Sequence, residues 1–138
     1  MAISGLRFGH VAFKVSKLEQ SLRCYADAFG AKKIYHAEAT GERPELMFLE
    51  FAKGQYIELL TGGQRKIEPP TDRAGYMHFC LLVDDINEAL THLTAMNVRI
   101  ERSLFTGRAR QFIFFISDPD GNVTEPMQIP PDSPLYRE

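Results

Sequence analysis

Apolar and polar residues alternate along several short stretches of the first half of the chain, a pattern typical of half-buried β-strands. A stripe of apolar residues at helical spacing, from Leu18 to Phe29, interrupts them, and Gly30 stands where a helix often ends. The strand-like stretches are 8–15, 32–37, 46–51 and 55–60. The first half is therefore predicted to form a βαβββ unit.

The second half repeats this order of elements. A strand-like stretch ends near Asp84 and Asp85, either of which can cap the helix that follows. The helix stripe runs from Ile86 to Met96. The other strand-like stretches are 76–83, 98–101, 112–116 and 123–129, with a loop over 105–111. A second βαβββ unit is predicted.

Candidate ligand residues recur with the repeat. His78 follows His10 by 68 positions, and each lies early in the first strand of its half. Glu125 follows Glu58 by 67 positions, and each comes four residues after a turn glycine. The repeat predicts an α+β fold of two tandem βαβββ modules that form a curved, mixed, eight-stranded sheet.

The predicted boundaries follow from the same repeat. One domain covers 1–138, with module one at about 6–62, module two at about 75–130 and a C-terminal tail at 131–138. The residues 61–75, rich in glycine and proline, are the linker. The tail carries three prolines and is expected to be draped or loose.

The stretch from Asp118 to Asn122 reads as a tight turn that leads into the last strand, because Pro119 fixes one φ angle and Gly121 permits a positive one. The strand then carries Glu125 between apolar neighbours. A carboxylate on such a face is costly unless it is paired, hydrogen-bonded or bound to a metal. Pro126 removes one backbone donor directly after Glu125 and is typical of an edge strand or a bulge.

Strand alternation puts the two histidines and two glutamates on sheet faces opposite the residues predicted to face the helices. Two imidazoles and two carboxylates suit a divalent ion such as Ni, Zn, Co, Fe or Mn better than Ca or Mg. The predicted metal ligands are His10, Glu58, His78 and Glu125.

Composition excludes several classes of protein. The net charge is −2 and the 16 basic residues are scattered, so no nucleic-acid partner is expected. No apolar run approaches the roughly 18 residues of a membrane span, so no membrane partner is expected either. The first residues show no apolar core of a signal peptide, and Cys24 and Cys80 fit reduced thiols. A cytoplasmic protein is expected.

Four stretches of the sequence resemble the vicinal oxygen chelate superfamily, which includes glyoxalase I, extradiol dioxygenases, fosfomycin-resistance enzymes, methylmalonyl-CoA epimerase and bleomycin-binding proteins. The resemblance covers nearly the whole chain. It rests on four groups of residues: Gly9–Val15 with Leu18, Ser21 and Tyr25; Tyr56–Leu60; His78 with Val83 and Asp84; and Asp118–Asn122 with Glu125.

The resemblance implies a metal-dependent, glyoxalase I-like (lactoylglutathione lyase-like) lyase or isomerase. It would act by proton transfer through an enediolate on a small α-hydroxycarbonyl compound or hemithioacetal, with Glu125 or Glu58 as the base. Glu58 favours the glyoxalase I-like activity, because the resemblance implies that dioxygenases and fosfomycin enzymes use only three ligands, at the positions of His10, His78 and Glu125. An extradiol dioxygenase, a fosfomycin-type thiol transferase, an epimerase and a non-catalytic drug-binding protein remain alternatives.

Two loop arginines, Arg108 and Arg110, could bind an anionic end of the small-molecule substrate or could equally be solvated. A homodimer is expected, because such half-barrels leave sheet edges that a second copy can cover. The sequence leaves open whether one chain or two supply the ligands of a site, which metal is bound and whether glutathione is used.

Overall fold

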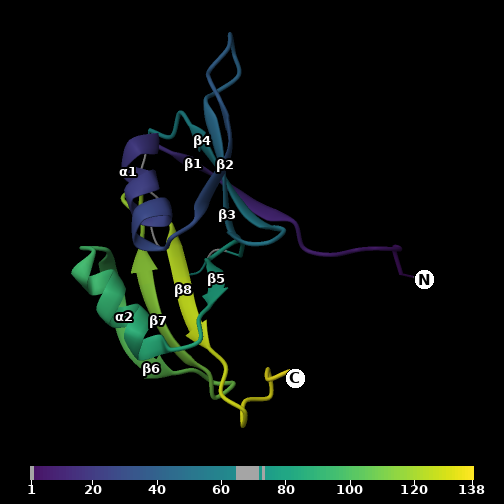
Figure 1. The fold of residues 1–138 in the computed structure, drawn as a ribbon, viewed down its shortest axis with the longest axis vertical. Coiled ribbons are helices and arrows are strands. Elements are labelled where there is room, and N and C mark those ends of the chain that lie inside the picture. The colour runs from purple at the N-terminus through teal and green to yellow at the C-terminus, as the bar shows by residue number, and fades with distance from the viewer. Residues whose placement is uncertain (1, 65–71, 73) are drawn as a thin grey trace. The chain divides into compact units, whose positions relative to one another are not determined.

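The computed structural model of the chain describes residues 2–64, 72 and 74–138. It consists of two compact units, Met1–Arg65 and Lys66–Glu138, each of which is described by itself (Figure 1). Most of the predicted linker, namely 65–71 and 73, lies outside the described residues.

Within its described residues, the first unit contains four strands and one helical segment. Its sheet has the order β1-β4-β3-β2, in which β1 and β4 are parallel and the other pairs are antiparallel. The strands are β1 (His10–Val15), β2 (Lys32–Ala37), β3 (Leu46–Ala52) and β4 (Gln55–Thr61). The helical segment consists of α1 (Leu18–Leu22) and a π-helix (Arg23–Ala28).

The helical segment packs on one face of this sheet. Tyr25 is fully buried and its ring meets Phe13 of β1 edge-on, with 5.6 Å between ring centroids. Val15, Leu49 and Leu59 are also fully buried. Since side chains alternate along a strand, His10 lies on the face opposite Phe13. The helix side of the first sheet is therefore its apolar core.

The π-helix is a departure from the uniform α-helix expected between Leu18 and Phe29. The amide of Phe29 donates to the carbonyl of Cys24, five residues earlier, at 3.1 Å. Such a turn holds more residues than an α-turn, and π-turns are rare in proteins. The apolar stripe alone does not reveal it, because α- and π-turns bury almost the same positions.

The second unit repeats the arrangement with the order β5-β8-β7-β6, in which β5 and β8 are parallel. Its elements are β5 (Phe79–Leu82), α2 (Ile86–Ala95), β6 (Arg99–Thr106), β7 (Phe112–Ser117) and β8 (Val123–Gln128). Of the two predicted candidates, Asp84 and Asp85, it is Asp85 that caps α2, where it accepts hydrogen bonds from the amides of Asn87 and Glu88. The strand β6 is longer than predicted because Thr106 still pairs with Phe112.

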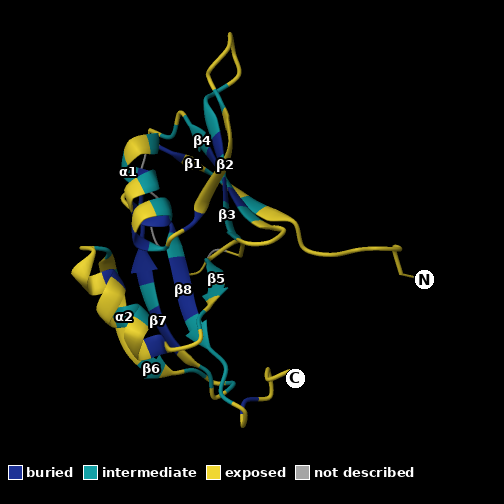
Figure 2. Cartoon of the chain, in the orientation of Figure 1, coloured by how far each residue is buried: buried dark blue, intermediate teal, exposed yellow. Residues whose placement is uncertain are grey.

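The core of the second unit lies between α2 and the inner strands β7 and β8, whose buried positions are dark blue in Figure 2. Phe114 and Ile116 of β7 are fully buried, as are Thr124 of β8 and, at 1% exposure, Ile86 of α2. The predicted tandem βαβββ modules are thus confirmed. Among the described residues, their eight strands are hydrogen-bonded as two sheets of four rather than as one continuous sheet.

Pro126 was expected to mark an edge strand or a bulge, and this expectation is wrong. The strand β8 is interior, with β5 on one side and β7 on the other. The register across β7 and β8 is the same before and after the proline, from Ile116↔Thr124 to Ile113↔Met127. Pro126 therefore removes a donor from the ladder without shifting it, and Glu125 keeps its place in the strand.

The turn before β8 is built on a buried carboxylate. Asp118, 4% exposed, accepts hydrogen bonds from the amides of Asp120 (2.9 Å) and Asn122 (2.8 Å) and from the side-chain amide of Asn122 (2.8 Å). Gly121 has a φ of 88°, which a side chain would disfavour. The turn predicted from the sequence is confirmed, and it fixes where β8 begins.

The C-terminal tail is held against the loop between β6 and β7. Ser133 is buried, and its hydroxyl donates to the carbonyl of Ala109 at 2.6 Å. The Nε of Arg110 donates to the carbonyl of Asp132 at 2.8 Å. Of the two expectations for the tail, draped or loose, the structure shows the first. No helix among the described residues is long and apolar enough to cross a membrane.

Thr124→Val is expected to stabilise the protein. The Thr124 hydroxyl is fully buried and has no hydrogen-bond partner among the described residues. Removal of an unsatisfied hydroxyl without a change of shape should raise the free energy of unfolding by about 1 kcal/mol. Chemical denaturation measures this, with Thr94→Val as control, since the Thr94 hydroxyl is exposed and donates to Leu90. A loss of stability in Thr124→Val would contradict the prediction.

Candidate metal centre

The first unit pairs His10 with Glu58. His10 is the first residue of β1, and Glu58 lies in the parallel neighbour β4, in register with Ala12. Since His10 and Ala12 share a face of β1, the two functional side chains point the same way. The His10 Nε2 lies 3.4 Å from the Glu58 Oε2. Parallel pairing of the first and last strands of the unit therefore brings this histidine and this carboxylate together.

The second unit pairs His78 with Glu125 in the same way. His78 directly precedes β5, and Glu125 lies in the parallel neighbour β8, in register with Cys80. The His78 Nε2 lies 2.8 Å from the Glu125 Oε2. Glu125 is only 8% exposed. Each unit thus holds one of the predicted histidines against its own predicted glutamate, through the same pair of atoms.

An aromatic ring accompanies each histidine, and the sequence interpretation missed it. Phe48 of β3 meets the His10 ring edge-on at 5.5 Å, and Phe115 of β7 meets the His78 ring at 5.2 Å. Phe115 follows Phe48 by 67 positions, the same offset that separates the two glutamates. That offset was the signal by which both rings could be recognised as members of the repeat.

The surroundings of the second pair keep neighbouring groups protonated. Partial burial, and secondarily the negative charge of Glu125, raise the pKa of the Cys80 thiol to about 11. Burial, and secondarily Asp118, also raise the pKa of Tyr76. Cys80 is in register with Glu125, so a neutral thiol lies beside the carboxylate.

The donor set of the two pairs fits a borderline divalent ion. Each unit supplies one imidazole nitrogen and one carboxylate oxygen. Mixed nitrogen and oxygen donors suit Zn, Ni, Co, Fe or Mn. Within the described part of the chain, no cluster of three or more His, Cys, Asp or Glu residues is positioned to hold a metal. Each pair by itself is thus half of the predicted ligand set.

The two predicted substrate-binding arginines lie in the turn between β6 and β7. Arg110 has a φ of 61° and donates to the tail at Asp132, whose carboxylate lies 3.8 Å from the Arg110 Nε. Arg108 is exposed. The contact with Asp132 gives Arg110 a partner within the chain, and the substrate contact of both arginines stays a prediction.

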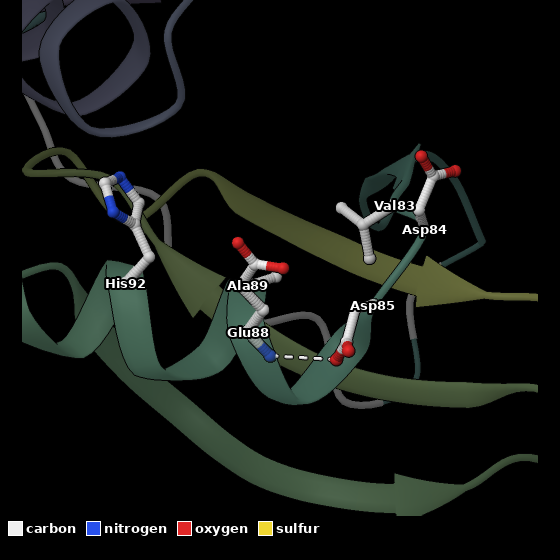
Figure 3. Close-up of a pocket in the computed structure, with 6 residues that line it drawn as sticks. All are labelled: Val83, Asp84, Asp85, Glu88, Ala89 and His92. Atoms are coloured by element: carbon white, nitrogen blue, oxygen red, sulfur yellow. Dashed lines mark hydrogen bonds between the residues drawn. The ribbon is translucent and has the colours of Figure 1, made fainter.

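A surface pocket of about 270 Å³ lies beside the N-terminal half of α2 (Figure 3). Its polar lining is acidic apart from one histidine, and Asp85 is engaged in capping the helix. The lining residues are Val83, Asp84, Asp85, Glu88, Ala89 and His92. None of the four predicted ligands is among them, so this pocket is separate from both histidine–glutamate pairs.

Curated relatives of the chain are lactoylglutathione lyases. The enzyme of Schizosaccharomyces pombe is 27% identical over 86% of the chain and 46% of its own length. That of Pseudomonas putida is 26% identical over 90% of the chain and 86% of its own length. The chain therefore spans about half the length of the first relative and most of the second.

Solved structures share the fold. A V278E mutant of glyoxalase I from Zea mays matches with a TM-score of 0.77 and 25% identity, over 89% of the chain and 44% of that protein. The fosfomycin resistance protein FosX of Listeria monocytogenes, complexed with Mn(II) and sulfate, matches with a TM-score of 0.71 and 19% identity, over 98% and 100%.

A family model decides the classification. The sequence model of the Glyoxalase/Bleomycin resistance protein/Dioxygenase superfamily matches residues 7–125. This span contains both histidine–glutamate pairs and most of both units. The resemblance seen in the sequence motifs is thereby confirmed. The chain belongs to the Glyoxalase/Bleomycin resistance protein/Dioxygenase superfamily.

Proposed function

We propose that the protein is a glyoxalase I-like lyase or isomerase that uses a divalent metal ion and acts on a small hemithioacetal or related α-hydroxycarbonyl compound. The observation that carries the proposal is the repeated pairing of a histidine Nε2 with a glutamate Oε2, once in each unit. A family member that needs only three ligands has no use for Glu58 at the His10 ring. The occupation of all four positions favours the glyoxalase-like activity.

We propose that His10, Glu58, His78 and Glu125 together bind one ion of Ni, Zn, Co, Fe or Mn. When bound, the ion supplies Lewis acidity for two neighbouring oxygens of the substrate. The names of the curated relatives support this activity, and the Mn(II) complex of FosX is in keeping with a metal in this fold. The proposal is specific about ligand identity and leaves the choice among the five metals to measurement.

Glu125 is proposed as the general base. Its carboxylate is nearly buried, lies on a rigid interior strand and already faces an imidazole through one oxygen. A carboxylate held this way can take a proton from the carbon next to the substrate carbonyl and return it to the adjacent carbon. Glu58, in the equivalent place of the other unit, is the second candidate for this proton transfer. The rings of Phe48 and Phe115 pack edge-on against the two imidazoles.

Removal and return of the metal tests the proposed activity. Protein treated with a chelator should lose turnover of methylglyoxal in the presence of a thiol, and addition of Ni or Zn should restore it. Turnover is followed by the disappearance of the hemithioacetal. Failure of every reloaded metal to support turnover would contradict the proposed substrate.

Metal content tests the ligand set independently of substrate. Wild-type protein should bind about one ion per chain, and His10→Ala and His78→Ala should each lose most of it, since both histidines hold the same ion. Elemental analysis after dialysis gives the ratio. His92→Ala, a change on the exposed face of α2, is the control and should retain the ion. Two ions in the wild type, one of which survives each single substitution, would show separate sites and overturn the four-ligand proposal.

The homodimer, the cytoplasmic location and the binding of substrate by Arg108 and Arg110 stay predictions. Among the described strands, β1 and β5 are each paired on one side only. This is the kind of sheet edge on which the dimer was predicted.

A further inference from the structure

Arg102 of β6 lies at an irregular place in the second sheet. The register between β6 and β7 shifts on both sides of this residue, between Ile100 and Arg102 and again between Arg102 and Phe105. Such β-bulges redirect side chains and are enriched next to active sites. Here the guanidinium carbon of Arg102 lies 3.4 Å from the centroid of the Phe105 ring. The bulged strand thus places a cation over an aromatic ring.

A continuous row of side chains connects this cation to Glu125. Arg102 is in register with Phe115 of β7. The pairs Ile113↔Met127 and Ile116↔Thr124 put Phe115 opposite Glu125 of β8. Neighbours in register share a face of the sheet, so all three point away from the core face that carries Phe114.

Ring contacts confirm that the row lies on one face. The Phe105 and Phe115 rings have centroids 5.9 Å apart, and the Phe115 ring is 5.2 Å from the ring of His78. Two strand spacings separate the backbone of Arg102 from that of Glu125, a distance of roughly 10 Å. A small molecule lying over Phe115 could therefore reach the His78–Glu125 pair with one end and Arg102 with the other.

Within the described part of the chain, the guanidinium of Arg102 makes no hydrogen bond or ion pair. The neighbouring acid does not neutralise it, because Glu101 accepts from the Arg99 Nε at 2.9 Å and from the Ser117 hydroxyl at 2.5 Å. Stacking on a ring restrains the guanidinium plane and leaves its N–H edge open. That edge matches a carboxylate through two parallel hydrogen bonds.

We propose that Arg102 is a specificity-determining residue that binds a carboxylate at the end of the substrate remote from the metal. The inference rests on the proposed function, because it takes the His78–Glu125 end as the reacting end. The substrate class is then a small molecule with two vicinal oxygens at one end, a carboxylate at the other and an uncharged middle that lies on Phe115. A positive charge at Arg102 selects against the corresponding amide.

Two stable probes test this without turnover. The carboxylate probe is 3-(3,4-dihydroxyphenyl)propanoate, whose vicinal oxygens can bind a metal, and the neutral probe is its amide. Titration calorimetry at constant ionic strength with zinc-loaded protein gives both dissociation constants. Wild type should bind the carboxylate about tenfold more tightly than the amide, as expected for a charge-assisted bidentate contact. Arg102→Gln should bring the ratio to about one and leave affinity for the amide nearly unchanged.

Arg99→Gln is the matched control, since it removes the same charge from the same strand at a residue already paired with Glu101. It should keep the wild-type preference. Equal binding of both probes by wild type would overturn the inference about Arg102 and leave the metal site standing. The same loss of preference in Arg99→Gln would also overturn it, because a general surface charge would then be responsible. Binding of neither probe would overturn both the metal site and the inference that rests on it.

Discussion

Glu125→Gln is expected to reduce turnover of the hemithioacetal formed from methylglyoxal and a thiol by roughly 10²- to 10⁴-fold. The amide keeps the size of the side chain but cannot accept the transferred proton, and it is a weaker metal ligand than a carboxylate. Initial rates with nickel- or zinc-loaded protein, alongside metal content, separate loss of the base from loss of the ion.

Glu58→Gln distinguishes between members of the superfamily. A four-ligand isomerase loses activity in this variant as well, whereas an enzyme that needs only His10, His78 and Glu125 retains it. Glu88→Gln, at an exposed site on α2, is the control and should behave as wild type. Wild-type turnover in Glu125→Gln would exclude Glu125 as the base, and wild-type turnover in Glu58→Gln alone would exclude the four-ligand isomerase.

Asp118→Ala is expected to destabilise the protein by about 3 kcal/mol. The substitution leaves two backbone amides and the Asn122 side chain without the carboxylate that accepts from them in the folded turn. For a chain of this size, such a loss lowers the melting temperature by roughly 10 °C. Scanning calorimetry or thermal circular dichroism measures the change.

The comparison for Asp118 is Asp84→Ala, which removes an exposed acid just before α2 and should change stability by less than about 0.5 kcal/mol. Because the turn fixes the start of β8, metal affinity should fall together with stability in Asp118→Ala. An Asp118→Ala protein as stable as Asp84→Ala would show that the turn does not depend on its carboxylate.

Much of the fold could be predicted because alternation and helical spacing depend on burial, and burial is similar in both units. The order of strands and helices, the cap at Asp85 and the turn at Asp118 follow from local chemistry. The prediction from Pro126 was wrong because a missing backbone N–H donor usually marks an edge strand. Here the strands on both sides of β8 hold it in register. Such compensation comes from neighbours distant in sequence, which local patterns do not reveal.

In the candidate site, too, some residues could be predicted from the sequence and others could not. The repeat singled out His10, Glu58, His78 and Glu125, and each unit of the structure brings its own histidine and glutamate together. Arg102 escaped notice because its direction depends on two register shifts in β6. Bulges are set by how two strands meet, so a single strand's sequence of polar and apolar residues carries little sign of them.

The π-helix lies where the spacing between the two repeats changes by one residue. The offset between equivalent positions is 68 from His10 through Leu22 and 67 from Gly30 onward, since Gly30 matches Asn97. Both of these residues end their helices with a positive φ, 82° and 59°. The change of offset therefore falls between Leu22 and Gly30, the stretch that contains the π-helix Arg23–Ala28.

The first unit thus carries one residue more than the second over this stretch, and the wider helical turn accommodates it. Two backbone hydrogen bonds show the same difference. The amide of Ala31 donates to the carbonyl of Tyr25, whereas the amide of its counterpart Val98 donates to the carbonyl of Leu93, which is one residue nearer in the sequence. The strands that follow kept their alignment, and Glu58 remained the counterpart of Glu125. An insertion in a hairpin of the same unit would instead have changed the register on which that equivalence depends.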